Sequence, residues 1–238
     1  MEEGEILMNP IPEIHDPERY TESSFAYSEF VKLENDDCFD ICMQYPILGM
    51  DNAECDCFVR IEVYELLKKA AGNLPNGYRF RILDAWRPFA LQKELYEDYS
   101  LDITDQFGLE GRPEEERNAF IRKFVSDPVP DTEVPPVHTT GGAVDITIIG
   151  PDGAELDMGS GFDEFSDRTY TVFYETSGNE IVKNNRRLLY NIMTGAGFTN
   201  LPSEWWHYDY GDRFWAYYNK RPALYRGVFT RNEIMVKM

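Results

Sequence analysis

Histidine is scarce in this chain, and two of its three copies occur in segments that also carry a carboxylate at a spacing suited to a common site. His138 precedes Asp145 in the segment PVHTTGGAVDITI. His207 follows Glu204 in the segment SEWWHY. Imidazole nitrogen and carboxylate oxygen are ligands of catalytic zinc, which takes three protein ligands and leaves a fourth position for water. A further carboxylate beside such a centre can take a proton from that water.

These residue types predict a single zinc ion per chain. His138, Asp145 and His207 are the expected ligands, and Glu204 is the expected general base. Each motif alone is short, and for either one a surface or core role of the histidine is the alternative. The presence of both motifs favours the metal site. A ligating histidine also needs an acceptor on its other ring nitrogen, but the sequence does not name that group.

The same segments resemble the signatures of a peptidase family. HTTGGAVD resembles the His-x-x-Gly-x-Ala-x-Asp signature of the zinc D-alanyl-D-alanine peptidases, and EWWH resembles their Glu-x-Trp-His signature. The segments DAWRP at 84–88 and DMGSGFD at 157–163 are similar to two further motifs of the D-alanyl-D-alanine dipeptidases of the vancomycin-resistance type. Because all four occur in the family's order across residues 84–207, the resemblance is specific.

The resemblance implies a zinc peptidase whose partner is a small D,D-dipeptide, and it implies roles for further residues. Arg87 would assist at the scissile bond, where a fixed guanidinium stabilises the developing oxyanion. Asp163 would hold the substrate ammonium. The N-terminal region of the family lines one side of the cleft, so Tyr27 or one of its neighbours is expected to contact substrate. One position departs from the family, because Pro136 stands where a serine usually precedes the first zinc ligand.

Alternatives remain for these residues and for the function. Arg87 could form a structural ion pair with Asp84, and Asp163 could be a turn residue. The protein could be a D,D-carboxypeptidase that acts on peptidoglycan stems, or it could bind a metal or a peptide without turnover. Glu204 favours catalysis, because binding alone needs no base beside the water.

Composition limits the partners and the location. The chain has 238 residues, with 23 basic and 43 acidic side chains and a formal charge of -20. This charge repels nucleic acids and anionic membrane surfaces, so neither is an expected partner. No long apolar run is present, and Met1–Glu5 lacks the basic start of a signal peptide. We therefore expect a cytoplasmic protein, whereas the oligomeric state is not determined by the sequence.

Four cysteines, at positions 38, 42, 55 and 57, fall in the first quarter of the chain. Their spacing could ligate a structural zinc, although the second pair is closer together than is usual for such a site. The alternative that we expect is a set of free thiols in a reducing compartment.

The fold class follows from hydrophobic spacing and turn signals. We expect one α+β domain over residues 1–238, with a central antiparallel sheet flanked by helices and an irregular N-terminal arm over residues 1–57. Helices are predicted at 58–71, 89–99, 113–126 and 184–196, and strands at 78–83 and 143–149. The tail, residues 213–238, is predicted to form an edge strand and a closing segment.

Strand periodicity also predicts where two site residues point. On strand 143–149, Asp145 shares a face with Ala143 and Thr147, while the residues between them face the core. Glu204 and His207 are three residues apart, so a regular strand would point them to opposite faces. We therefore expect Glu204 in a loop or bulge, with His207 on the strand.

Overall fold

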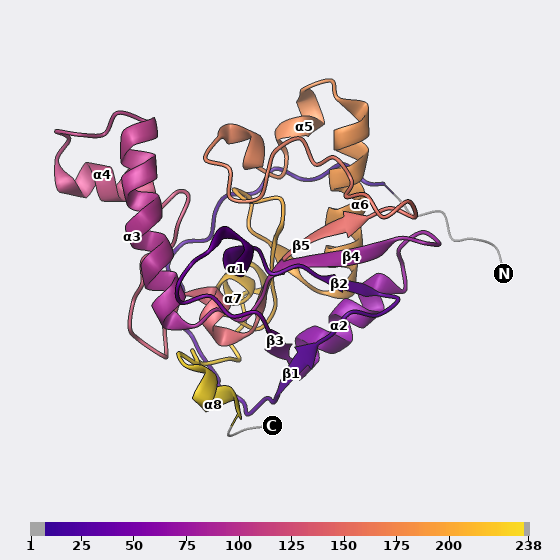
Figure 1. The fold of residues 1–238 in the computed structure, drawn as a ribbon, viewed down its shortest axis with the longest axis horizontal. Helices are drawn as coiled ribbons and strands as arrows, with labels where there is room; N and C mark the ends of the chain where they lie inside the picture. The colour runs from indigo at the N-terminus through magenta and orange to yellow at the C-terminus, as the bar shows by residue number, and fades with distance from the viewer. Residues whose placement is uncertain (1–7, 236–238) are drawn as a thin grey trace.

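The protein contains one five-stranded sheet and one two-stranded sheet, seen in the computed structural model that describes residues 8–235 (Figure 1). The order in the larger sheet is β2 (Phe39–Ile41), β4 (Arg79–Asp84), β5 (Ala143–Ile149), β7 (His207–Asp209) and β6 (Thr199–Asn200). Its neighbouring strands are antiparallel except for β2 and β4, which are parallel. The smaller sheet pairs β1 (Phe30–Leu33) with β3 (Cys57–Arg60).

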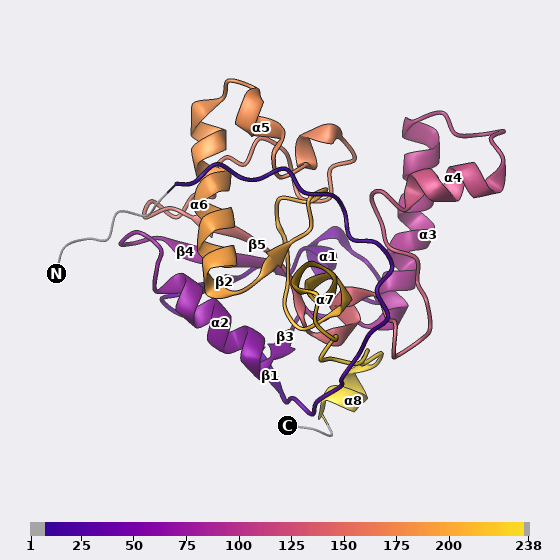
Figure 2. The ribbon, with the colours of Figure 1, turned by 180° about the vertical axis from the view of Figure 1, so that it is seen from behind.

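Helices surround the larger sheet, and the predicted α+β class is confirmed. They are α1 (Gln44–Leu48), α2 (Ile61–Ala71), α3 (Phe89–Gln106), α4 (Glu114–Ile121), α5 (Phe173–Thr176), α6 (Glu180–Ala196), α7 (Arg213–Asn219) and α8 (Arg231–Met235), with two 3-10 turns, η1 (Val137–Thr140) and η2 (Asp167–Thr169). The reverse view shows α2 and α6 lying together against the sheet, while α3 and α4 project from the opposite side of the molecule (Figure 2).

The central strand β5 separates the core from the side of the sheet that carries the polar cluster. Val144, Ile146 and Ile148 belong to the main core, which they share with apolar residues of α2 and α6. Because strand side chains alternate, Asp145 lies on the other face, where it lines a pocket. Both the bounds predicted for this strand and its facing are confirmed.

Two predicted elements are corrected by the structure. Phe58–Arg60 was expected in a helix but continues β3, and α2 begins only at Ile61; aromatic and β-branched side chains in this stretch favour the extended form. The tail forms α7 and α8 instead of an edge strand. Asp212 begins α7 by accepting hydrogen bonds from the N–H groups of Phe214 and Trp215, a typical N-cap.

The N-terminal part of the described chain is irregular at first and then joins the sheets. Residues 8–29 contain one isolated bridge, between Ser23 and Ala223, whereas residues 30–57 contribute β1, β2 and α1. Residues 1–7, on which the expected lack of an export signal rests, lie outside the described residues. No helix within residues 8–235 is long and apolar enough to cross a membrane.

Candidate metal centre and pocket

Three elements bring His138, Asp145 and His207 together. His138 lies in η1, Asp145 on β5 and His207 on β7, and the antiparallel pairing of β5 with β7 places the last two directly opposite each other. Gly141 ends η1 with a φ of 73°, and a Cβ atom there would collide with the ring of Phe30. Glycine is thus required at the turn between the first histidine and β5.

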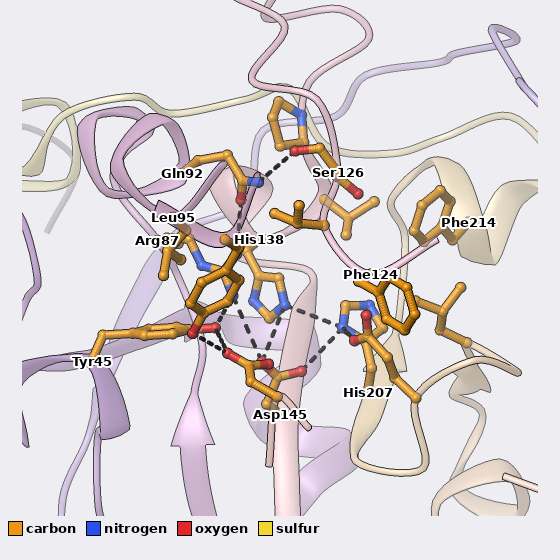
Figure 3. A pocket seen from close by; sticks show the side chains of 17 residues that line it. Tyr45, Arg87, Gln92, Leu95, Phe124, Ser126, His138, Asp145, His207 and Phe214 are labelled. Atoms are coloured by element: carbon orange, nitrogen blue, oxygen red, sulfur yellow. Dashed lines mark hydrogen bonds and ion pairs between the residues drawn. The ribbon is translucent and has the colours of Figure 1, made fainter. Parts of the chain in front are cut away.

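The ligand atoms of these residues are spaced as a tetrahedral metal requires. His138 Nε2 lies 3.2 Å from His207 Nδ1. Oδ2 of Asp145 lies 3.5 Å from His138 Nε2, and Oδ1 of Asp145 lies 3.0 Å from His207 Nδ1. Zinc–ligand bonds near 2.1 Å place neighbouring ligands of a tetrahedron about 3.4 Å apart. Figure 3 shows the three side chains turned toward one another. All three are buried, and they form the one group in the described chain that could hold a metal ion.

Hydrogen bonds on the far side of each ring orient the two histidines. His138 Nδ1–H donates to the carbonyl of Ala85 at 2.8 Å, and His207 Nε2–H donates to Oδ1 of Asp209 at 2.8 Å. In these tautomers, the nitrogens that face each other carry lone pairs and lie beside the Asp145 carboxylate. Such an electron-rich cluster fits a bound cation, and acceptors of this kind typically fix metal-ligating histidines.

Asp209 was missed by the sequence analysis. It is fully buried and follows His207 by two residues on β7, so the two side chains share a face. The two-residue repeat of a strand could therefore have predicted from the sequence that Asp209 lies beside His207. The backbone partner of His138, by contrast, comes from a segment more than fifty residues away.

Glu204 lies beside the cluster without belonging to it. Its Oε2 is 3.7 Å from His207 Nδ1, and its side chain keeps 21% exposure on the pocket. It sits in a turn where its N–H donates to Leu201 and its carbonyl accepts from the N–H of His207. As predicted, Glu204 is in a loop and His207 begins the strand. Burial, together with Asp145, raises the pKa of Glu204 to about 8, so this carboxyl can exchange a proton near neutral pH.

Arg87 is held at the edge of the same pocket by three partners. Its Nε donates to Oδ2 of Asp84, with which Nη2 also forms an ion pair. Its Nη1 donates to Gln92 Oε1, and its Nη2 donates to the hydroxyl of Tyr45. Burial opposes its charge, but Tyr45 and Asp84 raise the pKa of Arg87. Arg87 therefore forms the ion pair with Asp84 and also lies at the pocket. Its Nη2 is 3.8 Å from Oδ2 of Asp145.

Asp163 lies on the pocket wall under two tyrosines. The hydroxyls of Tyr45 and Tyr99 both donate to its Oδ2 at 2.8 Å, and the residue adopts a φ of 54°, a left-handed conformation that Asp tolerates better than most residues. Burial and the nearby Asp145 raise the pKa of Asp163 to about 6. The second carboxylate oxygen forms no hydrogen bond within the described chain and remains available to a ligand.

The structure does not bring Tyr27 to this pocket. Its side chain is 71% exposed and does not line the cavity. Tyr45 of α1 supplies the N-terminal aromatic hydroxyl instead, and only the packing of α1 beside α3 reveals it. Pro136 does line the pocket, but its carbonyl already accepts hydrogen bonds from the N–H and the hydroxyl of Thr139.

The four cysteines lie away from the histidine cluster and carry free thiols. Cys57 is buried, Cys55 is exposed, and Cys38 and Cys42 are half-buried. None of them belongs to a group that could hold a metal ion within residues 8–235.

The fold and the cluster define a class: an α+β protein with two histidines and one aspartate converging beside a pocket that also holds a carboxyl and a guanidinium. Residues 51–225 match the model of the D-ala-D-ala dipeptidase family. The chain belongs to this family. The matched range contains all the predicted site residues except Tyr27.

Several curated relatives carry the name D-alanyl-D-alanine dipeptidase. The chain is 36% identical to the protein of Synechocystis sp. over 160 residues, which is 61% of this chain and 65% of that relative. It is 40% identical to the Escherichia coli protein over 100 residues, which cover 41% of this chain and 50% of the relative. Identity to the Enterococcus faecium protein is 42% over 72 residues, 30% of this chain and 35% of the relative. The matches thus span less than two thirds of each relative's length.

Proposed function

We propose that this protein is a zinc-dependent dipeptidase that hydrolyses D-alanyl-D-alanine to two molecules of D-alanine. The observation that carries the proposal is the convergence of His138, Asp145 and His207 in ligand geometry beside the carboxyl of Glu204. Membership of the family and the names of the curated relatives support the choice of substrate.

The bound metal and the protein have separate tasks in this mechanism. A zinc ion in the site supplies a Lewis acid and lowers the pKa of water. Glu204 takes a proton from the attacking water and then gives it to the nitrogen of the leaving amine. With a pKa raised to about 8, both the ionised form of Glu204, which takes the proton, and the protonated form, which gives it back, are populated near neutral pH.

Arg87 and Asp163 recognise the reacting carbonyl and the free amine of the dipeptide, respectively, in this proposal. The Arg87 guanidinium, fixed by Asp84 and Gln92, donates to the carbonyl oxygen as it gains negative charge. The free oxygen of Asp163 pairs with the ammonium group of the dipeptide. Pro136 offers no hydroxyl, and its carbonyl is already engaged, so Asp163 carries amine recognition without the family's serine.

Release of D-alanine tests the proposal directly. The zinc-loaded protein is incubated with D,D- and L,D-dipeptides, N-acetyl-D-alanyl-D-alanine and a stem pentapeptide, and the released amino acid is measured. We expect D-alanyl-D-alanine to be the preferred substrate and the His138→Ala variant to be inactive with little bound zinc.

Other outcomes of the same assay would change the assignment. Preference for the pentapeptide or the acetylated substrate would indicate a D,D-carboxypeptidase, and no release from any substrate would indicate a binding protein. Zinc as the metal is tested by elemental analysis, with about one ion expected per chain. A cytoplasmic location remains a prediction from the sequence.

A further inference from the structure

Phe124 stands between two cavities that share one wall. The main pocket, of about 40 Å³, contains the histidine cluster and Arg87. A second cavity, of about 10 Å³, lies beside Lys123, Phe165 and Ser203. Phe124, Asp163 and Glu204 line both cavities. The second cavity has room for only about one water molecule, so it adds little space beyond the residues that line both cavities.

Phe124 is held in this position by other aromatic rings. Its ring lies 5.5 Å from that of Phe107, 5.8 Å from that of Phe120 and 5.7 Å from that of Phe165, measured between centroids. The first two partners belong to the α3–α4 region, and Phe165 follows the segment that carries Asp163. Contacts of this geometry stabilise aromatic pairs beyond the effect of burial. The ring is therefore a fixed part of the wall.

We propose that Phe124 is the residue that restricts the pocket to substrates with a free amine by closing the amine side of the main pocket. This inference rests on the proposed dipeptidase function and names the side chain that sets the length of the substrate. Figure 3 shows Phe124 on the same side of the pocket as His207.

The residues at the boundary explain why the amine side is the closed side. Asp163, which pairs with the ammonium group in the proposed function, and Glu204, which acts at the scissile bond, both contact the two cavities. In this proposal, a group attached to the amine extends between these carboxyls toward Lys123 and Ser203, and Phe124 is the aromatic ring that lines both cavities there. Exclusion of a longer substrate thus has a steric cause as well as the loss of the ammonium charge.

Shortening Phe124 should open this route. We expect Phe124→Ala to raise kcat/KM for N-acetyl-D-alanyl-D-alanine and for the tripeptide D-alanyl-D-alanyl-D-alanine, each relative to D-alanyl-D-alanine, by about tenfold or more, the scale of discrimination set by small steric differences in a pocket. Phe124→Leu should give a smaller change in the same direction.

Phe173→Ala is the control. Phe173 of α5 is an exposed phenylalanine that packs against Tyr174, has no contact with the aromatic rings around Phe124, and lines neither cavity. This variant should keep the ratios of kcat/KM among the three substrates that the parent protein has. Thermal melting checks that all variants remain folded.

The result can separate the two proposals. If the parent protein releases D-alanine from the dipeptide and both Phe124 variants keep its substrate ratios, the role of Phe124 is overturned while the dipeptidase function stands. If the parent protein releases nothing from the dipeptide, the proposed function itself fails. A change in ratio of equal size in Phe173→Ala would also overturn the inference, because it would show an effect that does not depend on the wall shared by the two cavities.

Discussion

The carboxyl of Glu204 is accessible from the pocket, has a raised pKa, and lies beside the expected metal ligands. Replacing it with glutamine preserves its shape but removes the proton acceptor. We expect Glu204→Gln to lower kcat by about two to four powers of ten, which is the usual contribution of a positioned base. Zinc content should stay near that of the parent, because Glu204 is not one of the expected ligands. Steady-state kinetics and elemental analysis measure the two effects.

The exposed residue Glu133 offers a control for Glu204. Its carboxylate pairs with Arg226 at the surface, away from the pocket, so Glu133→Gln should leave kcat unchanged. Equal turnover in Glu204→Gln and the parent would remove Glu204 from the mechanism.

Asp163 should give the reaction a dependence on pH. Its pKa of about 6 lies above the ordinary value of 3.8 because burial disfavours the ion, so the carboxyl is neutral below pH 6 and ionised above it. Pairing with an ammonium needs the ionised form. We expect kcat/KM for D-alanyl-D-alanine to fall as the pH drops through about 6, and this step to be missing in Asp163→Asn and with N-acetylated substrate. A step at the same pH with all three would assign the titration to another group.

At the level of elements, β7 delivers a ligand and its support together. His207 and Asp209 lie on one face of the strand, and the β5–β7 pairing sets His207 opposite Asp145. The strand therefore fixes the distance between two ligands, while the hydrogen bond to Asp209 fixes the rotation of the ring. This division of tasks is possible because a strand places every second residue on the same side.

The support from Asp209 can be measured through metal affinity. We expect Asp209→Ala to weaken zinc binding by about 10- to 100-fold, as is typical when the partner of a metal-ligating histidine is lost. Asp209→Asn keeps an acceptor oxygen and should weaken binding less. A competitive titration with a chromogenic chelator measures both. Unchanged affinity in Asp209→Ala would show that the ring is held by packing alone.

At the level of the whole molecule, the cluster joins segments that are far apart in the chain. His138, Asp145 and His207 come from η1, β5 and β7, so a metal bound by all three links the turn before β5 to the centre of the sheet and to β7. A ligand that binds the folded state stabilises it by mass action, by about 4 kcal/mol at a thousand times its Kd.

Removal of the metal should therefore lower the melting temperature. We expect a chelator to reduce the Tm and added zinc to restore it, with no such response in His138→Ala. His15 provides the matched control, because it is an exposed histidine far from the cluster in sequence, and His15→Ala should respond as the parent does. Differential scanning calorimetry makes the comparison. A zinc-dependent rise in Tm that survives in His138→Ala would place the metal elsewhere.

The sequence by itself determined the features that depend on local spacing. The candidate ligands and base were chosen by residue type, and the facing of β5 followed from the alternation of a strand, which leaves Asp145 on the pocket side and Val144 in the core. The loop position of Glu204 followed from its three-residue separation from His207. These predictions needed no knowledge of which distant segments meet.

Only the tertiary structure decided the contacts between distant segments. Tyr45 lies in the pocket and Tyr27 does not, because α1 packs beside α3, and neither residue carries a local signal of this packing. The carbonyl of Ala85 orients His138, and Phe124 closes the pocket, across separations that no periodicity spans. The alternation of aromatic and basic residues in the tail had predicted a strand. The tail is helical at α7 because the Asp212 side chain accepts hydrogen bonds from the first N–H groups of that helix.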